Sequence, residues 1–267
     1  MKIAALYDIH GNLPALQAVL EELQVIQPDV IVVGGDIVSG PLPGQTLKRL
    51  MQVEKPIYYI QGNADRELVQ TFDKRPLARR YLPPLSEKGV EEIEWLAQQI
   101  TQAERDFLAR QPRQLIFEMA TLGRILFCHA TPHSDEEIFT PLTPPQQLDT
   151  IFAEGTSDIV ICGHTHRQFE LLVGQHRILN AGSVGIPFAK EPGAYWLLLH
   201  PEGYEFRHTP FDGEAAAQVI RASGYPQAED FIATNVLKLR SPEEMTAMFE
   251  RLAQAFISKE KRVGTPH

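Results

Sequence analysis

Five short motifs in the first two thirds of the chain carry the residue types that bind metal ions. They are Asp8-Ile-His10, Gly35-Asp36, Gly62-Asn63, His129 and Gly163-His164-Thr165-His166. Carboxylate, amide and imidazole groups together suit transition-metal ions. Each motif alone is weak evidence, because a lone Asp-x-His is common by chance. Together the five motifs predict a metal centre with enough ligands for two ions.

Each of these motifs closes an apolar run that predicts a β-strand. The runs are Met1–Tyr7, Val30–Gly34, Ile57–Gln61, Ile125–Cys128 and Asp158–Cys162. In an open α/β sheet, ligands bind outside the carboxyl ends of the strands. We therefore expect five strands to deliver the polar side chains to one rim.

These residues, in this order, resemble the calcineurin-like metallophosphoesterase superfamily over roughly Met1–Phe211. The resemblance is to the compact bacterial and archaeal branch often labelled ApaH-like or YfcE-like, through Asp8-Ile-His10-Gly11-Asn12 and Asn180-Ala-Gly-Ser-Val-Gly185. It implies an α/β fold built as a four-layer α/β/β/α sandwich. It also implies two divalent metal ions, foremost Mn, with Fe, Zn, Ni or Co as alternatives.

The resemblance implies two overlapping ligand sets: Asp8, His10, Asp36 and His166 on one ion, and Asp36, Asn63, His129 and His164 on the other. Asp36 is then the bridge. The spacing supports part of this independently, because side chains two apart on a strand share a face, so that Asp8 and His10 can chelate one ion. By spacing alone His164 and His166 could share an ion as well, whereas the resemblance divides them.

Two such ions predict hydrolysis of a phosphate ester. A hydroxide bridging the ions would attack phosphorus in line, so that Asp36, Asn63 and His129 act in catalysis through the metals. The expected substrate is a phosphomonoester or phosphodiester: a nucleotide, a phosphoprotein or another small phosphate ester. The alternative is a scaffold or binding protein that keeps the fold with weak catalysis. Competent residues at all seven ligand positions favour the enzyme.

Other residues next to the ligands are candidates for proton transfer and phosphate binding. Many superfamily members have a histidine directly after the asparagine, where this chain has Ala64. His133 and Asp65 could instead protonate the leaving oxygen, although each residue could equally be structural. The phosphate candidates are Asn12, Arg66 and Arg167, with solvated arginines as the alternative for the latter two.

Composition excludes several classes of protein. The chain has 267 residues with 43% apolar residues, enough for a substantial core. A net charge of −9 argues against stable nucleic-acid binding and a nuclease function. No apolar run is long enough to span a membrane, and no signal-peptide pattern precedes the first strand. Cys128 and Cys162 indicate no disulfide framework, so we expect a cytoplasmic protein.

The motifs lie in a metallophosphoesterase domain over residues 1–211, followed by a helical extension over residues 212–267. Residues 66–112 form a predicted helical insertion, either a lid or substrate wall or an ordinary helical pair packed on the sheet. Residues 168–211 predict two β-hairpins and hence a second sheet. The extension ends in a helix after Ser241, with an apolar stripe of Met245, Met248, Phe249, Leu252 and Phe256. We expect this helix to pack on the outside of the sandwich, with a homo-oligomer interface or capping of the substrate as the alternatives. We predict that it supports the fold or an interface and remains clear of the chemistry.

Overall fold

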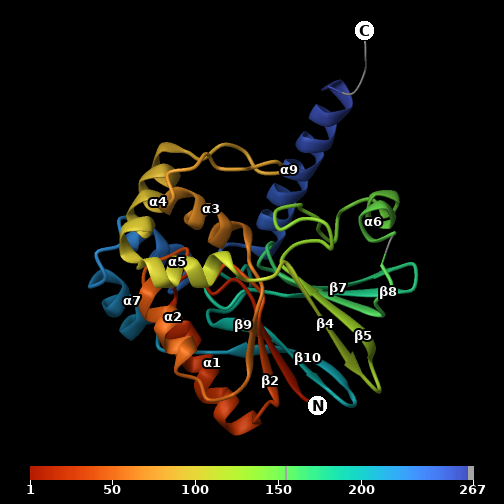
Figure 1. The fold of residues 1–267 in the computed structure, drawn as a ribbon, viewed down its shortest axis with the longest axis horizontal. Helices are drawn as coiled ribbons and strands as arrows, with labels where there is room; N and C mark the ends of the chain where they lie inside the picture. Colours follow the sequence, from red (N-terminus) through yellow and green to blue (C-terminus); the bar gives the residue numbers. More distant parts are fainter. Residues whose placement is uncertain (154, 264–267) are drawn as a thin grey trace.

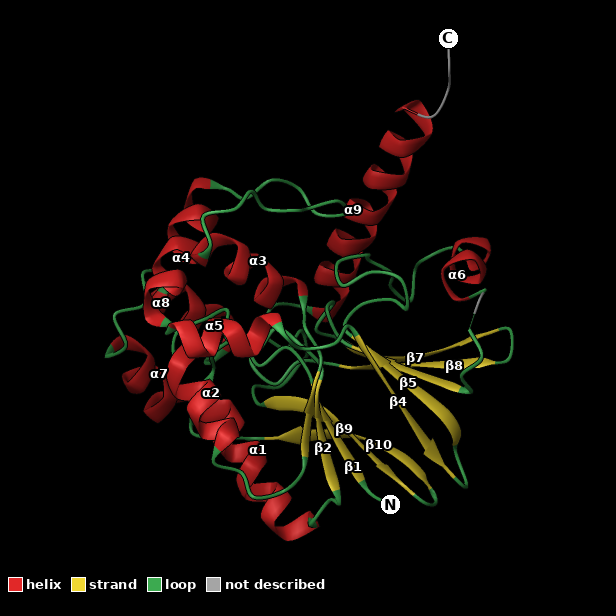
Figure 2. Ribbon diagram, in the orientation of Figure 1, coloured by secondary structure: helices red, strands yellow, loops and turns green. Residues whose placement is uncertain are grey.

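Two five-stranded sheets pack face to face in the computed structural model, which describes residues 1–153 and 155–263 (Figures 1 and 2). The first sheet has the order β10-β9-β1-β2-β3, with strands β1 (Ile3–Leu6), β2 (Val30–Val33), β3 (Ile57–Tyr59), β9 (Ala194–His200) and β10 (Gly203–Thr209). The second has the order β4-β5-β6-β8-β7, with strands β4 (Gln114–Met119), β5 (Gly123–Cys128), β6 (Ile159–Cys162), β7 (Gln168–Val173) and β8 (His176–Ala181).

Helices flank both sheets and complete the predicted α/β/β/α sandwich, which is confirmed. The first sheet is covered by α1 (Leu13–Ile26), α2 (Pro43–Met51), α3 (Asn63–Phe72), α4 (Glu87–Gln99) and α5 (Gln102–Ala109). The second sheet is covered by α6 (Pro145–Phe152). The chain continues through α7 (Gly213–Arg221), α8 (Ala228–Asn235) and α9 (Pro242–Val263). No helix in these described residues combines the length and apolarity needed to cross a membrane.

The core lies in layers because the central strands are apolar on both faces. Tyr7, Phe127 and Ile161 are fully buried between the two sheets. Leu6 and Val33 point the other way, into the helices on the first sheet. Continuous apolar runs are typical of strands covered on both sides. This core fixes the strand ends from which the polar side chains extend.

The strands that precede the metal-binding motifs belong to both sheets, which corrects the expectation of one rim. β1 pairs in parallel with β2, and β2 with β3. β5 pairs in parallel with β6 in the other sheet. An apolar run does not specify its neighbour, so the sequence could not assign the strands to sheets. The two sets of carboxyl ends nevertheless lie together, because the sheets are packed face to face.

Both hairpins form as predicted, but only one of them belongs to the second sheet. β7 pairs antiparallel with β8 in that sheet. β9 pairs antiparallel with β10, and β9 also joins β1, which returns the chain to the first sheet. β4 was not predicted at all. It pairs antiparallel with β5 at the edge of the second sheet.

The predicted helical insertion divides into packed helices and a long loop. Leu96 of α4 and Leu108 of α5 are buried in the core above the first sheet, as in the packed-pair interpretation. Residues 73–86, here called the 73–86 loop, connect α3 to α4 and run towards α9 (Figure 1). The packed helices and the loop therefore have different roles.

The C-terminal helix α9 packs against the body at its beginning and projects from it at its end (Figure 1). Of the predicted apolar stripe, Met245 is buried, whereas the other four residues are half-buried: Met248, Phe249, Leu252 and Phe256. Residues 264–267 of the predicted extension lie outside the described residues. The partial burial indicates that α9 forms one wall of a more open region.

Candidate metal centre

The predicted ligands converge in two groups at the carboxyl ends of the strands. Asp8, His10 and His166 form one group, and Asp36, His129 and His164 form the other; within each group the ligand atoms lie within 4.8 Å of one another. These groups coincide with the division that the family resemblance implies. Asp36 lies between them, with Oδ2 3.4 Å from His129 Nε2 and 3.8 Å from His10 Nε2.

Most of these ligands have a left-handed backbone, which side-chain-bearing residues seldom adopt. The φ angles are 52° at Asp8, 48° at His10, 53° at Asp36, 66° at His164 and 57° at His166. Each such residue costs about 1–2 kcal/mol. Hydrogen bonds between neighbouring loops hold the conformation, for example His10 N to Asp36 O at 2.9 Å. Strain concentrated at one place indicates a functional site.

Two glycines next to the ligands are required by the close approach of ligand carboxylates. A Cβ at Gly62 would lie 2.1 Å from Asp36 Oδ1, and a Cβ at Gly163 would lie 2.3 Å from Asp8 Oδ2. Both distances are far inside van der Waals contact. The glycines of the motifs therefore make room for the ligand side chains.

Three histidines are oriented by backbone carbonyl groups. His10 Nδ1 lies 3.0 Å from Ser39 O, and His129 Nδ1 lies 2.8 Å from Gly34 O. His166 Nδ1 lies 2.9 Å from Ile186 O. A carbonyl can only accept, so each Nδ1 carries a proton, and Nε2 is the atom that remains to bind a metal ion. This arrangement is typical of metal-ligating histidines.

The lone pairs at the centre face one another, which is unfavourable unless a cation lies among them. His10 Nε2 and His166 Nε2 are 3.1 Å apart. Asn63 Oδ1 lies 3.2 Å from His129 Nε2, so this contact also sets a lone pair against a lone pair whenever His129 is neutral. Asp8 Oδ1 and His164 Nε2 are buried without a hydrogen-bond partner. These residues fit a pair of divalent cations.

The charges of the centre are strongly coupled. Burial opposes ionisation of Asp36, but His129 and His10 lower its pKa below the usual range. Burial would lower the pKa of His129, but Asp36 and Asp8 raise it to about 10. Burial and the neighbouring His129 lower the pKa of His164 to about 4. A proton held by His129 therefore competes with a metal ion for the same position.

Asp65 orients the backbone around Asp36. Its carboxylate accepts from Ile37 N at 2.9 Å and from Gly62 N at 3.2 Å. Ala64 N in turn donates to Asp36 Oδ1 at 2.8 Å. Burial, followed by repulsion from Asp36, raises the pKa of Asp65 to about 7. Both oxygens of Asp65 are engaged with the backbone, so its role as a proton donor stays a prediction that these contacts do not favour.

The other predicted residues are engaged elsewhere or exposed. Asn12 donates to Gly185 O at 2.9 Å and caps α1. Arg66 pairs with Asp135 at 2.6 Å. Arg167 donates to Thr246 Oγ1 of α9 at 2.6 Å. His133 is exposed beside α6. Contact of these residues with a substrate phosphate or leaving oxygen remains a prediction.

One neighbour of the centre was missed at the level of sequence. Phe188 stacks on His166, with ring centroids 5.2 Å apart and an interplanar angle of 29°. Phe249 of α9 lies behind it, with centroids 6.0 Å apart. Together with the Arg167–Thr246 bond, this places α9 one ring away from a ligand, closer than we expected. Pro187, directly before Phe188, was the only local signal of an ordered loop there.

Comparisons with known proteins agree with the geometry. A family model described as the calcineurin-like phosphoesterase superfamily domain matches residues 1–202. This range contains every residue of the two ligand groups, and it ends before α7, α8 and α9.

Relatives and solved structures extend the likeness over most of the chain. The chain is 24% identical over 207 residues to Phosphodiesterase YfcE of Escherichia coli strain K12, which covers 74% of this chain and 87% of that protein. It is 30% identical over 202 residues to Uncharacterized protein MJ0912 of Methanocaldococcus jannaschii, and this match covers 69% of this chain and 76% of that protein. A metallophosphoesterase from Sphaerobacter thermophilus has the same fold, with a TM-score of 0.65 and 22% sequence identity. The match covers 87% of this chain and 97% of that structure.

Proposed function

Because the chain belongs to the calcineurin-like phosphoesterase superfamily, whose members are metal-dependent, we propose that it is a dinuclear metal phosphoesterase. It hydrolyses a phosphate ester and takes phosphodiesters among its substrates. The likeness to a phosphodiesterase of Escherichia coli supports this substrate class.

The observation that carries the proposal is the convergence of ligand atoms at the two groups, among them imidazole nitrogens that carry no proton. Nε2 atoms of His10 and His166 face one another at 3.1 Å, while the carbonyl groups of Ser39 and Ile186 fix their protons on Nδ1. A binding scaffold has no need to hold such atoms together at the expense of a strained backbone. A pair of cations needs this arrangement. The mix of oxygen and nitrogen ligands suits first-row transition metals, and the family resemblance makes Mn the foremost candidate among them.

When bound, a pair of divalent ions supplies a water acidic enough to react at neutral pH and positive charge for the phosphate oxygens. The protein holds this pair rigidly. Asp36 shares its carboxylate between the groups, and the Ala64 amide fixes its orientation. The carbonyl of Gly34 fixes the tautomer of His129. No serine or cysteine nucleophile is required, and buried Cys128 and Cys162 face the core.

Departure of the leaving oxygen receives little help from the side chains around Asn63. Ala64 has no acid, and Asp65 uses both oxygens on backbone amides. We therefore infer that the enzyme prefers esters with good leaving groups, and that a water protonates poorer ones. General acid help is otherwise worth about 10²–10⁴-fold.

The test is hydrolysis of bis(4-nitrophenyl) phosphate and 4-nitrophenyl phosphate by metal-depleted protein, before and after addition of Mn²⁺. We expect no turnover without metal, turnover of the diester after addition, and its loss on chelation. Metal binding without turnover of any ester would support the scaffold reading instead. Turnover by fully metal-depleted protein would contradict the mechanism.

A further inference from the structure

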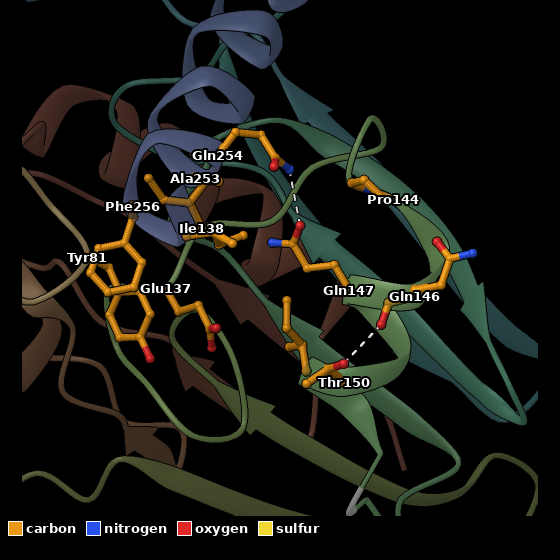
Figure 3. Close-up of a pocket in the computed structure, with 12 residues that line it drawn as sticks. Tyr81, Glu137, Ile138, Pro144, Gln146, Gln147, Thr150, Ala253, Gln254 and Phe256 are labelled. Atoms are coloured by element: carbon orange, nitrogen blue, oxygen red, sulfur yellow. Dashed lines mark hydrogen bonds between the residues drawn. The ribbon is translucent and has the colours of Figure 1, made fainter. Parts of the chain in front are cut away.

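A cavity of about 520 Å³ lies between α6, α9 and the 73–86 loop (Figure 3). We call it the α9 pocket. Tyr81 and Phe256 form one side, with ring centroids 4.5 Å apart and planes tilted by 41°. Ile138, Ile151 and Ala253 add apolar surface. The volume lies within the range of ordinary small-molecule sites.

One wall of the α9 pocket leads down to Asn63. The carbonyl oxygen of Asp135 lies 3.2 Å from the side-chain amide of Asn63. Ile138 follows three residues later, so it is at most about 10 Å along the chain from this contact. Glu137, which also lines the pocket, accepts from the Thr131 hydroxyl at 2.9 Å, two residues after His129. This wall therefore begins beside the ligands of the Asp36 group.

The opposite wall leads down to His166. Ala253 lies one helical turn, about 5.4 Å, after Phe249 on α9. Phe249 contacts Phe188, and Phe188 stacks on His166. One wall of the α9 pocket is therefore connected to the Asp36–His129–His164 group, and the other is connected to the Asp8–His10–His166 group. The α9 pocket is thus connected through its walls to both ligand groups.

The lining favours a flat group with polar edges. Tyr81 and Phe256 supply aromatic surface. Gln254 and Gln147 bring amide groups to the same space (Figure 3). Gln254 Nε2 donates to Gln147 Oε1 at 3.1 Å and to Glu250 Oε1 at 2.8 Å, so Gln147 presents its Nε2 as the amide donor there. Aromatic rings stack favourably on rings, and amides pair with ring nitrogen and oxygen atoms.

We propose that the α9 pocket receives a planar ring group carried by the substrate phosphate, as in an aryl or nucleoside ester. The inference rests on the proposed function, because the metal centre must hold the phosphate. It assigns substrate selection to α9, which lies beyond the family-model match.

The test compares phenylphosphonate with methylphosphonate on the full-length, Mn-loaded protein by titration calorimetry. The carbon–phosphorus bond is not an ester, so binding is measured whether or not the protein hydrolyses esters. Burial of the ring should make phenylphosphonate bind on the order of tenfold more tightly. A nucleoside 5′-phosphonate as a third ligand separates the two sources of the ring: tighter binding than the phenyl compound indicates a nucleobase, and weaker binding an aryl group.

Two substitutions in the α9 pocket should reduce the preference for the ring to about twofold or less. Phe256→Ala removes aromatic surface, and Ala253→Leu fills the cavity, so a folding defect in one variant leaves the other informative. Phe206→Ala is the control, because Phe206 is a partly exposed phenylalanine on β10, an edge strand of the first sheet, and does not line the α9 pocket. It should keep the tenfold preference.

The outcomes separate this inference from the proposed function. Equal binding of both phosphonates to the wild-type protein overturns the α9 pocket as a ring site while leaving the metal centre intact. An undiminished preference in folded, metal-loaded Phe256→Ala and Ala253→Leu has the same meaning. If neither phosphonate binds the Mn-loaded protein, both the proposed function and this inference fail.

Discussion

The strand ends that carry the ligands and the helix α9 that packs beside them are built by different means. At the strand ends, backbone hydrogen bonds between loops fix nearly every ligand, as His10 N does with Asp36 O. At α9, contact with the centre passes mainly through side chains: Phe249 contacts Phe188, and Arg167 donates to Thr246, with a longer bond of 3.4 Å from Arg167 to the Pro242 carbonyl. The metal-binding chemistry is therefore held rigidly by the backbone, whereas its surroundings are open to substitution.

This difference matches the extent of the family likeness. The family model covers the strand ends and stops before α9. Under the proposed function, catalysis depends on the first region, and we infer that substrate choice and the strength of metal binding are adjusted by the second. The following predictions test that division, from the largest expected effect to the smallest.

Asp36→Asn should have the largest effect, because Asp36 is the carboxylate shared by the two groups. We expect weaker binding of both ions and a fall in hydrolysis of several orders of magnitude. Metal analysis and turnover of bis(4-nitrophenyl) phosphate measure this. Asp29→Asn, at the opposite end of β2, is the matched control and should behave as wild type. A folded Asp36→Asn protein with full metal content and turnover would remove Asp36 from its assigned role.

Ala64→His tests whether the rigid region lacks an acid. The wild-type protein should hydrolyse aryl diesters much faster than alkyl diesters, because it lacks the general acid help that is worth about 10²–10⁴-fold. An imidazole at this position should narrow that gap, provided that it reaches the leaving oxygen. Rates across a series of leaving groups measure the gap, with Ala64→Asn as a control without an acid. A wild-type rate that does not depend on the leaving group, with chemistry rate-limiting, would mean that another acid already acts.

Phe249→Ala tests whether α9 supports the metal centre. Loss of the ring behind Phe188 should loosen His166 and weaken Mn²⁺ binding at the Asp8–His10–His166 group by about 10–100-fold, as for other groups that orient ligands. Phe256→Ala is the control on the same helix, because Phe256 contacts Tyr81 and lies about two turns away. It should retain the wild-type metal affinity. Equal metal affinities in the two variants would show that α9 does not support the metal centre and contributes only to the α9 pocket.

Glu67→Gln tests the link between the two regions through the stability of the fold, and it should have the smallest effect on hydrolysis. Glu67 of α3 pairs with Arg79 at 3.0 Å, two residues before Tyr81. Burial raises the pKa of Glu67 to about 7, against the opposing effect of Arg79. A carboxyl whose pKa is higher in the folded state contributes stability at low pH, and this contribution is lost as the pH rises from about 4.5 through 7.

The free energy of unfolding of Glu67→Gln, relative to wild type, should therefore rise between pH 5 and pH 8, by on the order of 3 kcal/mol at most. Urea unfolding of both metal-depleted proteins at the two pH values measures the difference. A difference that stays constant with pH would show that Glu67 is already ionised in the folded protein at pH 5.

The sequence predicted the strand ends that carry the ligands, and it missed most of the side-chain contacts through which α9 packs beside them. Apolar runs such as Val30–Val33 end at polar ligands, so strands and ligands could be located together. The strands could not be assigned to sheets from the sequence, because β1 and β5 have the same apolar pattern yet lie in different sheets. β4 was missed because its half-exposed residues give only weak alternation.

The position of α9 shows why tertiary contacts escape a pattern. Its apolar stripe predicted a buried face but not what covers that face. Phe249 and Phe188 are 61 residues apart in the chain, and nothing local connects them. These contacts revise the expectation that the helix lies clear of the chemistry, and we predict that truncation after Arg240 weakens metal binding.

The number of metal ions required for hydrolysis tests the central claim most directly. Metal-depleted protein is titrated with Mn²⁺, and bound metal per chain is measured alongside the rate of bis(4-nitrophenyl) phosphate hydrolysis. We predict two bound ions per chain, with turnover rising only as the second site fills. Saturation at a single ion with full activity, or hydrolysis that does not depend on bound metal, would contradict a dinuclear metal phosphoesterase.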